Sequence, residues 1–266
     1  MTIKLTADEV DEQYQEAEEE ELQFDPTDEL DITWKYDERC SQGWRREIDL
    51  REGVYLTIDQ SQAVDHIMID GPETASQSIL CTFFLSGHEQ WMMKSNLSEA
   101  LLTNSTTGQY CLISNGLYPQ SLFNCALRPW SSVSIDIHPK ILQSFAVSSE
   151  GNLPQSLQHL VRPLSQLIYV RSSDIQPMML SVLQQILHCP YQGLVKRAYL
   201  DSKVIELMAL VLDHEVTIQQ GDIQQHSLRP EQLERIHYAK EILLRDLSNP
   251  PSLESLPSIK SDESLP

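Results

Sequence analysis

The sequence predicts an α+β protein in which an antiparallel β-barrel or sandwich comes first and helices follow. Short runs of apolar residues between turn signals occupy residues 44–139. From residue 139 onward the apolar residues recur at helical spacing. The acidic residues are concentrated before residue 39, which separates a charged segment from the body of the chain.

Residues 1–38 hold fifteen acidic residues against Lys4 and Lys35. Segments that combine high charge with few apolar residues bury too little surface to offset the entropy of ordering. We therefore expect residues 1–38 to be a disordered acidic tail. The net charge of the whole chain is −20, which disfavours contact with nucleic-acid phosphates.

The segment 39–139 reads as a series of short strands rather than alternating strands and helices. Gly and Pro signals and a loop rich in Asn, Ser and Thr at 95–109 separate them. The expected strands lie at 44–50, 54–61, 64–70, 79–87, 110–114, 121–127 and 132–138. This spacing is typical of an antiparallel barrel or sandwich.

Helices are expected at 139–146, 153–166, 174–188 and 194–214, which makes residues 140–217 a helical region. The last of these helices carries an apolar stripe and a second apolar flank, so it packs on two sides. It serves either as core or as a dimerisation helix. The stripe consists of Leu200, Val204, Leu207, Met208 and Val211.

A polar linker at 218–229 precedes one further helix. Pro230 fits its first position, where the missing N–H costs nothing. Asn249-Pro250-Pro251 ends it, because proline disfavours helical geometry in the preceding residue.

Two segments carry a resemblance to a known family. QILHCPYQGLVKRAYLDSKVIEL, within residues 184–212, and LERIHYAKEILLRDLSNPPSLESL, from residue 233, occur in that order. Together they resemble the siderophore-responsive, pyochelin-regulator-like branch of the AraC family of bacterial transcription regulators. The resemblance spans about residues 44–256 and implies a cupin-like sensor domain at 39–139, dimerisation or coupling helices, and a DNA-binding domain of two helix-turn-helix units.

The chain departs from that family after Leu256. Pro257 interrupts the helix, and too few residues follow for a second helix and its turn. Residues 230–266 are therefore expected to be a remnant that retains only the first helix of the helix-turn-helix domain.

No sequence motif predicts catalysis. The eight histidines form no pair at metal-ligand spacing, and there is no nucleophile elbow or phosphate-binding loop. The five cysteines are scattered, which fits a reducing cytoplasm. The sequence thus predicts a cytoplasmic protein that is not an enzyme, has no cofactor or metal site, and lacks a membrane span.

The candidate effector pocket rests on aromatic residues of the β region with a few polar groups, a composition that suits a bulky aromatic ligand. Packing in the core is the alternative for each of them. The candidates are Trp44, Arg46, His66, Phe84, His88, Trp91, Tyr110 and Trp130.

The resemblance implies a regulator of transcription that binds a small effector such as a ferric siderophore and dimerises with itself or with an intact relative. Because most of the DNA-reading domain is missing, contact with DNA would need that partner, and the chain could act as a negative modulator. The alternative functions are a cupin-like small-molecule-binding protein and a cupin-type enzyme, both without a DNA role.

Overall fold

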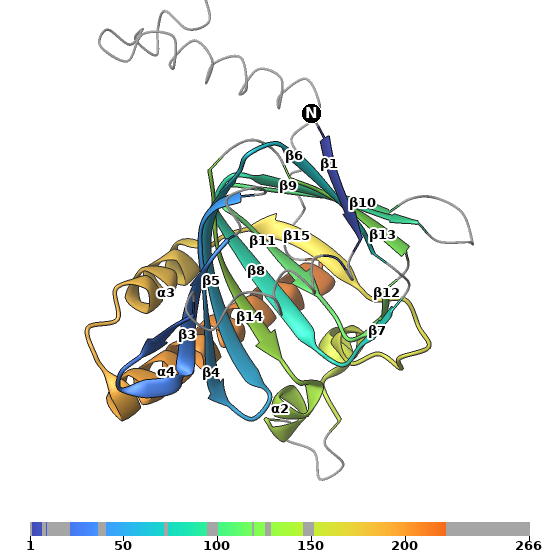
Figure 1. Cartoon of the computed structure of the whole chain (residues 1–266). Helices are drawn as coiled ribbons and strands as arrows, with labels where there is room; N and C mark the ends of the chain where they lie inside the picture. The colour runs from blue at the N-terminus through green and yellow to red at the C-terminus, as the bar shows by residue number, and fades with distance from the viewer. Residues whose placement is uncertain are drawn as a thin grey trace, which may run out of the picture. The chain divides into compact units, whose positions relative to one another are not determined.

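The computed structural model describes residues 2–6, 9, 22–36, 41–71, 74–94, 101–118, 120–125, 129–145 and 152–221. The chain divides into two units, residues 1–220 and 221–266. Only the first is described below. It has an α+β fold in which most of the strands precede the helices, as predicted (Figure 1).

Strands make up most of the unit. Their bounds are β1 Thr2–Thr6, β2 Gln23–Asp25, β3 Asp28–Lys35, β4 Ser41–Arg51, β5 Val54–Ala63, β6 His66–Gly71, β7 Thr74–Ser76, β8 Ile79–Ser86, β9 His88–Lys94, β10 Leu101–Thr106, β11 Gln109–Ile113, β12 Gly116–Tyr118, β13 Gln120–Cys125, β14 Trp130–Ile137 and β15 Val170–Asp174.

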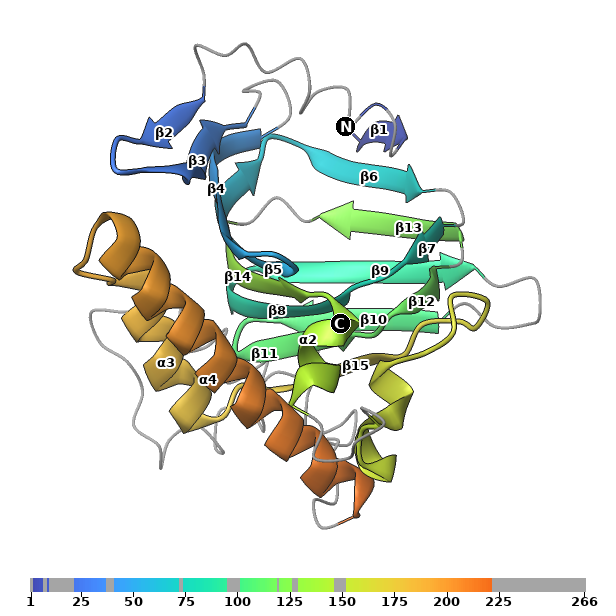
Figure 2. The same cartoon turned by 90° about the horizontal axis from the view of Figure 1, so that it is seen from below.

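The larger sheet has the order β15-β11-β8-β14-β5-β4-β3-β2 and the second sheet the order β1-β6-β13-β9-β10. Strands β7 and β12 form a separate pair. All the ladders of the larger sheet are antiparallel. Figure 2 shows α3 and α4 on one side of the larger sheet and β6, β13 and β9 of the second sheet on the other.

The helices are α2 Pro139–Ser144, α3 Pro177–Leu187 and α4 Gly193–Gln219, with a 3₁₀ helix, η2, at Gln155–Leu160. Pro177 occupies the first turn of α3, where proline is tolerated. The helix expected at 153–166 is wrong beyond residue 160. Pro163 disfavours helical geometry in Arg162, and Val161 instead forms a β-bridge with Asn115.

The core lies between the larger sheet and the helices. Alternate residues of the central strands, such as Leu56 in β5 and Ile135 in β14, are fully buried and point to the helix side. Met179 and Leu183 of α3 pack against them. A tight turn at Glu52-Gly53 joins β4 to β5, and Gly53 adopts a φ of 76°, which favours glycine.

Each strand predicted from the sequence is present, but the predicted boundaries of the β region are wrong at both ends. Residues 22–36, expected in the disordered tail, form β2 and β3 at one edge of the larger sheet. Strand β15 adds residues 170–174 at the other edge. Residues 2–6, also expected in that tail, form β1, which pairs with β6 in the second sheet. Residues 1, 7–8, 10–21 and 37–38 of the expected tail lie outside the described residues.

The predicted linker also begins later than expected, because α4 continues to Gln219. The rest of the linker and the expected remnant at 230–266 lie outside the described residues.

Candidate functional site

The β2–β3 hairpin is shaped by its acidic residues. The carboxylate of Asp25 accepts hydrogen bonds from the backbone N–H of Thr27 at 2.7 Å and from its hydroxyl at 2.6 Å. Such side-chain bonds to the backbone two residues ahead stabilise a turn, and Pro26 fixes one φ within it. The hairpin therefore folds back tightly enough for its two strands to form the wall of a cleft.

An open cleft of about 440 Å³ lies over strands β2, β3 and β4. It combines indole rings with charged groups, which is the lining that a small aromatic ligand needs. Its lining residues are Gln23, Phe24, Asp25, Asp31, Thr33, Trp34, Lys35, Trp44 and Arg46.

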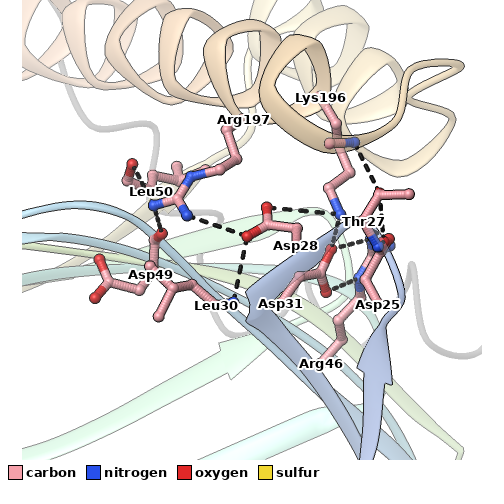
Figure 3. Close-up of polar contacts among 11 residues, drawn as sticks. Asp25, Thr27, Asp28, Leu30, Asp31, Arg46, Asp49, Leu50, Lys196 and Arg197 are labelled. Atoms are coloured by element: carbon pink, nitrogen blue, oxygen red, sulfur yellow. Dashed lines mark hydrogen bonds and ion pairs between the residues drawn. The ribbon is translucent and has the colours of Figure 1, made fainter.

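Behind the cleft, the first turns of α4 are bound to the hairpin by ion pairs (Figure 3). Lys196 is 2% exposed, and its ammonium donates to Asp31 at 2.5 Å and to Asp25 at 2.8 Å. Arg46 of β4 holds the same Asp31 through two parallel bonds of 2.7 and 2.6 Å. A buried charge is tolerated when it is paired and hydrogen-bonded in this way.

The neighbouring Arg197 adds a second connection. Its guanidinium donates to Asp28 at 3.0 Å and to the carbonyl oxygens of Asp49 and Leu50. The N–H of Gly193, at the start of α4, donates to the Thr27 hydroxyl at 3.0 Å. We call Asp25, Asp28, Asp31, Arg46, Lys196 and Arg197 the N-terminal anchor of α4.

The charges of this anchor stabilise one another's ionised forms. The hydrogen bond from Lys196 lowers the pKa of Asp25 well below its usual range. Burial alone would raise the pKa of Asp31, but the bonds from Arg46 and Lys196 outweigh it and lower that pKa. Burial likewise opposes the charge of Lys196, whereas its two carboxylate partners raise the pKa above the usual value. These three groups are therefore ionised at neutral pH.

A second buried charge fixes the other end of α4. Glu215 is 0% exposed and accepts hydrogen bonds from Tyr169 at 2.7 Å and from Gln219 at 3.1 Å. His159 lies 3.0 Å from its carboxylate and Arg171 lies 3.4 Å away. We call these five residues the C-terminal anchor.

Burial would raise the pKa of Glu215, yet the hydrogen bonds from His159, Tyr169 and Gln219 and the charge of Arg171 lower it to about 2. Next to it, Nδ1 of His214 lies 2.9 Å from the Tyr110 hydroxyl, and burial lowers the pKa of this histidine. Both ends of α4 are thus attached to the β structure through polar contacts.

The structure divides the predicted pocket residues instead of bringing them together. Trp44 and Arg46 line the cleft. Phe84 and Tyr110 are 1% and 0% exposed and belong to two different core clusters, so their assignment to an open pocket is wrong. They alternate across the sheet, because Tyr110 pairs with Phe83, the neighbour of Phe84.

Trp130 is half-buried against the same cluster as Phe84 and does not line the cleft. His66 lies in β6, and His88 and Trp91 lie in β9, both in the second sheet. Their backbones are described but their side chains are not.

The five residues of the predicted dimer helix, Leu200, Val204, Leu207, Met208 and Val211, are all between 0% and 2% exposed. They pack in the core with α3 and the larger sheet. The prediction of a dimer seam at these side chains is therefore wrong, and the core alternative is confirmed. Their stripe faces the chain's own sheet, which leaves none of them on a surface.

The residues that sequence reasoning missed are the hairpin acids and their partner on α4. Asp25, Asp28 and Asp31 recur every third residue, and each contacts a cation of the anchor. Their spacing is a usable signal, but the high acidic content of residues 1–38 hides it. Lys196 stands out because a cation occupies the helix position four residues before Leu200, on the apolar face.

Within the described ranges, no group of three His, Cys, Asp or Glu side chains is placed to hold a metal ion. No helix in the same ranges is both long enough and apolar enough to cross a bilayer.

These observations define an α+β domain in which an open cleft and a long helix share one ion-pair network. The family model of the regulatory protein PchR N-terminal domain matches residues 42–230. The chain therefore belongs to that family. None of the curated proteins compared with the chain matches it.

Solved structures show weaker likenesses. The alignment with apo ToxT from Vibrio cholerae, a variant in which one lysine is replaced by alanine, has a sequence identity of 10% and a TM-score of 0.43. It covers 79% of this chain and 72% of the ToxT chain. Fatty-acid-bound ToxT is 11% identical with the same TM-score, over 73% of this chain and 65% of its own. An oxalate decarboxylase variant from Bacillus subtilis is 9% identical, with a TM-score of 0.28, over 54% and 42%. With TM-scores this low, no argument rests on these likenesses.

Proposed function

We propose that this chain is the effector-sensing part of an AraC-type transcription regulator, with its effector bound in the cleft over β2, β3 and β4. The observation that carries the proposal is that Asp31 and Arg46 belong both to the lining of the cleft and to the anchor of α4. A ligand in the cleft therefore reaches Arg46, which is bonded to Asp31 and through it to the helix. Membership of a regulatory family supports this function.

The effector we propose is a ferric siderophore of the aromatic type. Trp34 and Trp44 offer flat apolar surfaces, and Lys35 and Arg46 offer positive charge to an anionic chelate. Such a chelate brings its iron already coordinated, so it needs no ligands from the protein. We also propose a cytoplasmic location, which fits the scattered cysteines, and pairing with a second copy or a related regulator, as the sequence resemblance implies.

The test is thermal unfolding of the full chain with a ferric phenolate siderophore, its iron-free form and ferric citrate. We expect the ferric siderophore to stabilise the chain by about 2–3 kcal/mol at a concentration near one hundred times its Kd. Ferric citrate should leave stability unchanged, because it offers no aromatic surface.

Two variants test whether the ligand binds in the cleft. Trp44→Leu should weaken siderophore binding at least tenfold, whereas Trp130→Leu, its matched control outside the cleft, should not. Equal losses in both variants, or stabilisation by ferric citrate alone, would contradict the proposed site.

A further inference from the structure

Charges of alternating sign connect the cleft to α4. Arg46 bonds Asp31, Asp31 bonds Lys196, and Lys196 bonds Asp25, each through distances between 2.5 and 2.8 Å. Asp31 is 1% exposed and Lys196 is 2% exposed, so the inner half of this series is shielded from solvent. Charge pairs shielded from water interact more strongly than exposed ones.

The outer half opens on the cleft. Arg46 uses Nε and Nη2 for Asp31, and Nη1 takes no part in that pair. The Arg46 side chain is 32% exposed, and Lys35 on the same wall is exposed as well. A guanidinium can accept a second anion on its remaining edge.

The positive groups that face the cleft are available to an anion. The charged residues of its lining are Lys35, Arg46, Asp25 and Asp31. Both carboxylates are paired with Lys196 behind the cleft. A planar aromatic monoanion can therefore meet Lys35 and the outer edge of Arg46 while it stacks on the indole walls.

We propose that the cleft recognises an aromatic anion through Arg46 and that Asp31 relays its binding to Lys196 at the start of α4. This inference rests on the proposed function and adds the recognition group and the route of the signal. An anion on Arg46 competes with Asp31 for the guanidinium. Asp31 then interacts more strongly with Lys196, which fastens the β2–β3 hairpin to the helix.

The relay has a reciprocal consequence. If an anion in the cleft tightens the contact between the hairpin and α4, loss of that contact must weaken anion binding by the same factor. The factor is expected to be modest, about fivefold, since Lys196 does not line the cleft.

The experiment uses the full chain with 2-naphthoate as the probe and 2-naphthamide as its uncharged counterpart. Binding is followed by tryptophan fluorescence, and hydrogen exchange is measured in residues 193–200 and 23–35. In the wild type, naphthoate should bind at least tenfold more tightly than naphthamide. It should also slow exchange in both segments.

Three variants separate recognition from relay. Arg46→Gln should bind naphthoate at least tenfold more weakly than the wild type does. Its affinities for naphthoate and naphthamide should then be similar. Lys196→Met should still bind naphthoate, with an affinity reduced about fivefold, but should lose the protection of residues 193–200. Thr27→Val, a milder change that removes the hydroxyl bonded to Gly193 and to Asp25 but keeps Lys196, should reduce this protection without abolishing it.

Each contrary result would overturn a specific part of the proposal. Naphthoate binding through Arg46 that leaves exchange in residues 193–200 unchanged would overturn the relay while the proposed function stands. Equal affinity for both probes in the wild type would overturn recognition of the anion. Protection of residues 193–200 that persists in Lys196→Met would show that the signal takes another route.

Discussion

The two ends of α4 are attached to the β structure by networks of opposite design. At the N-terminal anchor a buried lysine is surrounded by carboxylates from the hairpin. At the C-terminal anchor a buried glutamate is surrounded by His159, Tyr169, Arg171 and Gln219. Between them an apolar stripe buries the helix against the core.

The anchors differ most in their access to solvent. Asp25 and Arg46 of the N-terminal anchor have side chains 23% and 32% exposed and lie on the cleft. Glu215 has no exposed surface, and Arg171 is 19% exposed. The C-terminal anchor therefore resembles a fixed structural contact, whereas the N-terminal anchor can respond to a ligand.

The largest loss is expected from removal of the buried glutamate. Glu215→Ala removes the carboxylate that accepts from the Tyr169 hydroxyl and neutralises Arg171, and the free energy of unfolding should fall by about 4 kcal/mol. Urea unfolding of the full chain followed by circular dichroism measures this change.

The matched control is Glu206→Ala on the same helix, where the acid forms an exposed pair with Lys203. That substitution should alter the free energy of unfolding by no more than about 0.5 kcal/mol. Similar losses in both variants would mean that the C-terminal anchor does not hold the helix.

Acid should weaken the same anchor. Glu215 has a pKa of about 2 in the folded chain against an ordinary value of 4.5. Its contribution is therefore fully present above pH 4.5 and is lost as the pH falls toward 2, because the unfolded chain takes up the proton first. Across this window it amounts to about 3 kcal/mol.

The acid effect is measured by urea unfolding at several pH values in the wild type and in Glu215→Gln. The variant should show a shallower decline below pH 4.5. The depressed pKa values of Asp25 and Asp31 leave part of the slope in both proteins. Parallel declines would assign the acid sensitivity to those hairpin residues instead.

The N-terminal anchor should contribute less to the free energy of unfolding than the C-terminal anchor does. Lys196→Met removes the ammonium but keeps the apolar stem, and Arg46 still neutralises Asp31. The free energy of unfolding should fall by about 2 kcal/mol, below the cost of an unpaired buried charge.

Lys203→Met is the control for this variant, because Lys203 lies on the same helix and its ammonium pairs with the exposed Glu206 one turn away. This control substitution should lower the free energy of unfolding by about 0.3 kcal/mol. A decrease for Lys196→Met larger than that for Glu215→Ala would reverse the ranking of the two anchors.

The sequence predicted the repeating parts of this structure well. Alternation in β5 and β14 and the stripe from Leu200 to Val211 specify which faces are apolar, and those faces form the core. Local patterns suffice here because burial of an apolar face depends little on which partner covers it.

The anchors could not be read in the same way. Asp31 and Lys196 are 165 residues apart, and only the tertiary fold brings their charges together. Before that pairing is known, an acidic segment such as residues 22–36 reads as solvated chain. The same holds for Glu215, whose partners come from η2, β15 and the segment between them.

The smallest expected effect is that of salt, and it sharpens the contrast between the anchors. Mobile ions screen exposed pairs more than buried ones. Raising the ionic strength from about 0.05 to about 0.5 M should reduce the loss caused by Lys196→Met by about 0.5 kcal/mol. The loss caused by Glu215→Ala should change less, because no surface of Glu215 is exposed. Urea unfolding of both variants at the two salt concentrations measures the difference. An equal response would mean that the N-terminal anchor is as closed to solvent as the C-terminal one, which would remove the physical basis for its control by a ligand in the cleft.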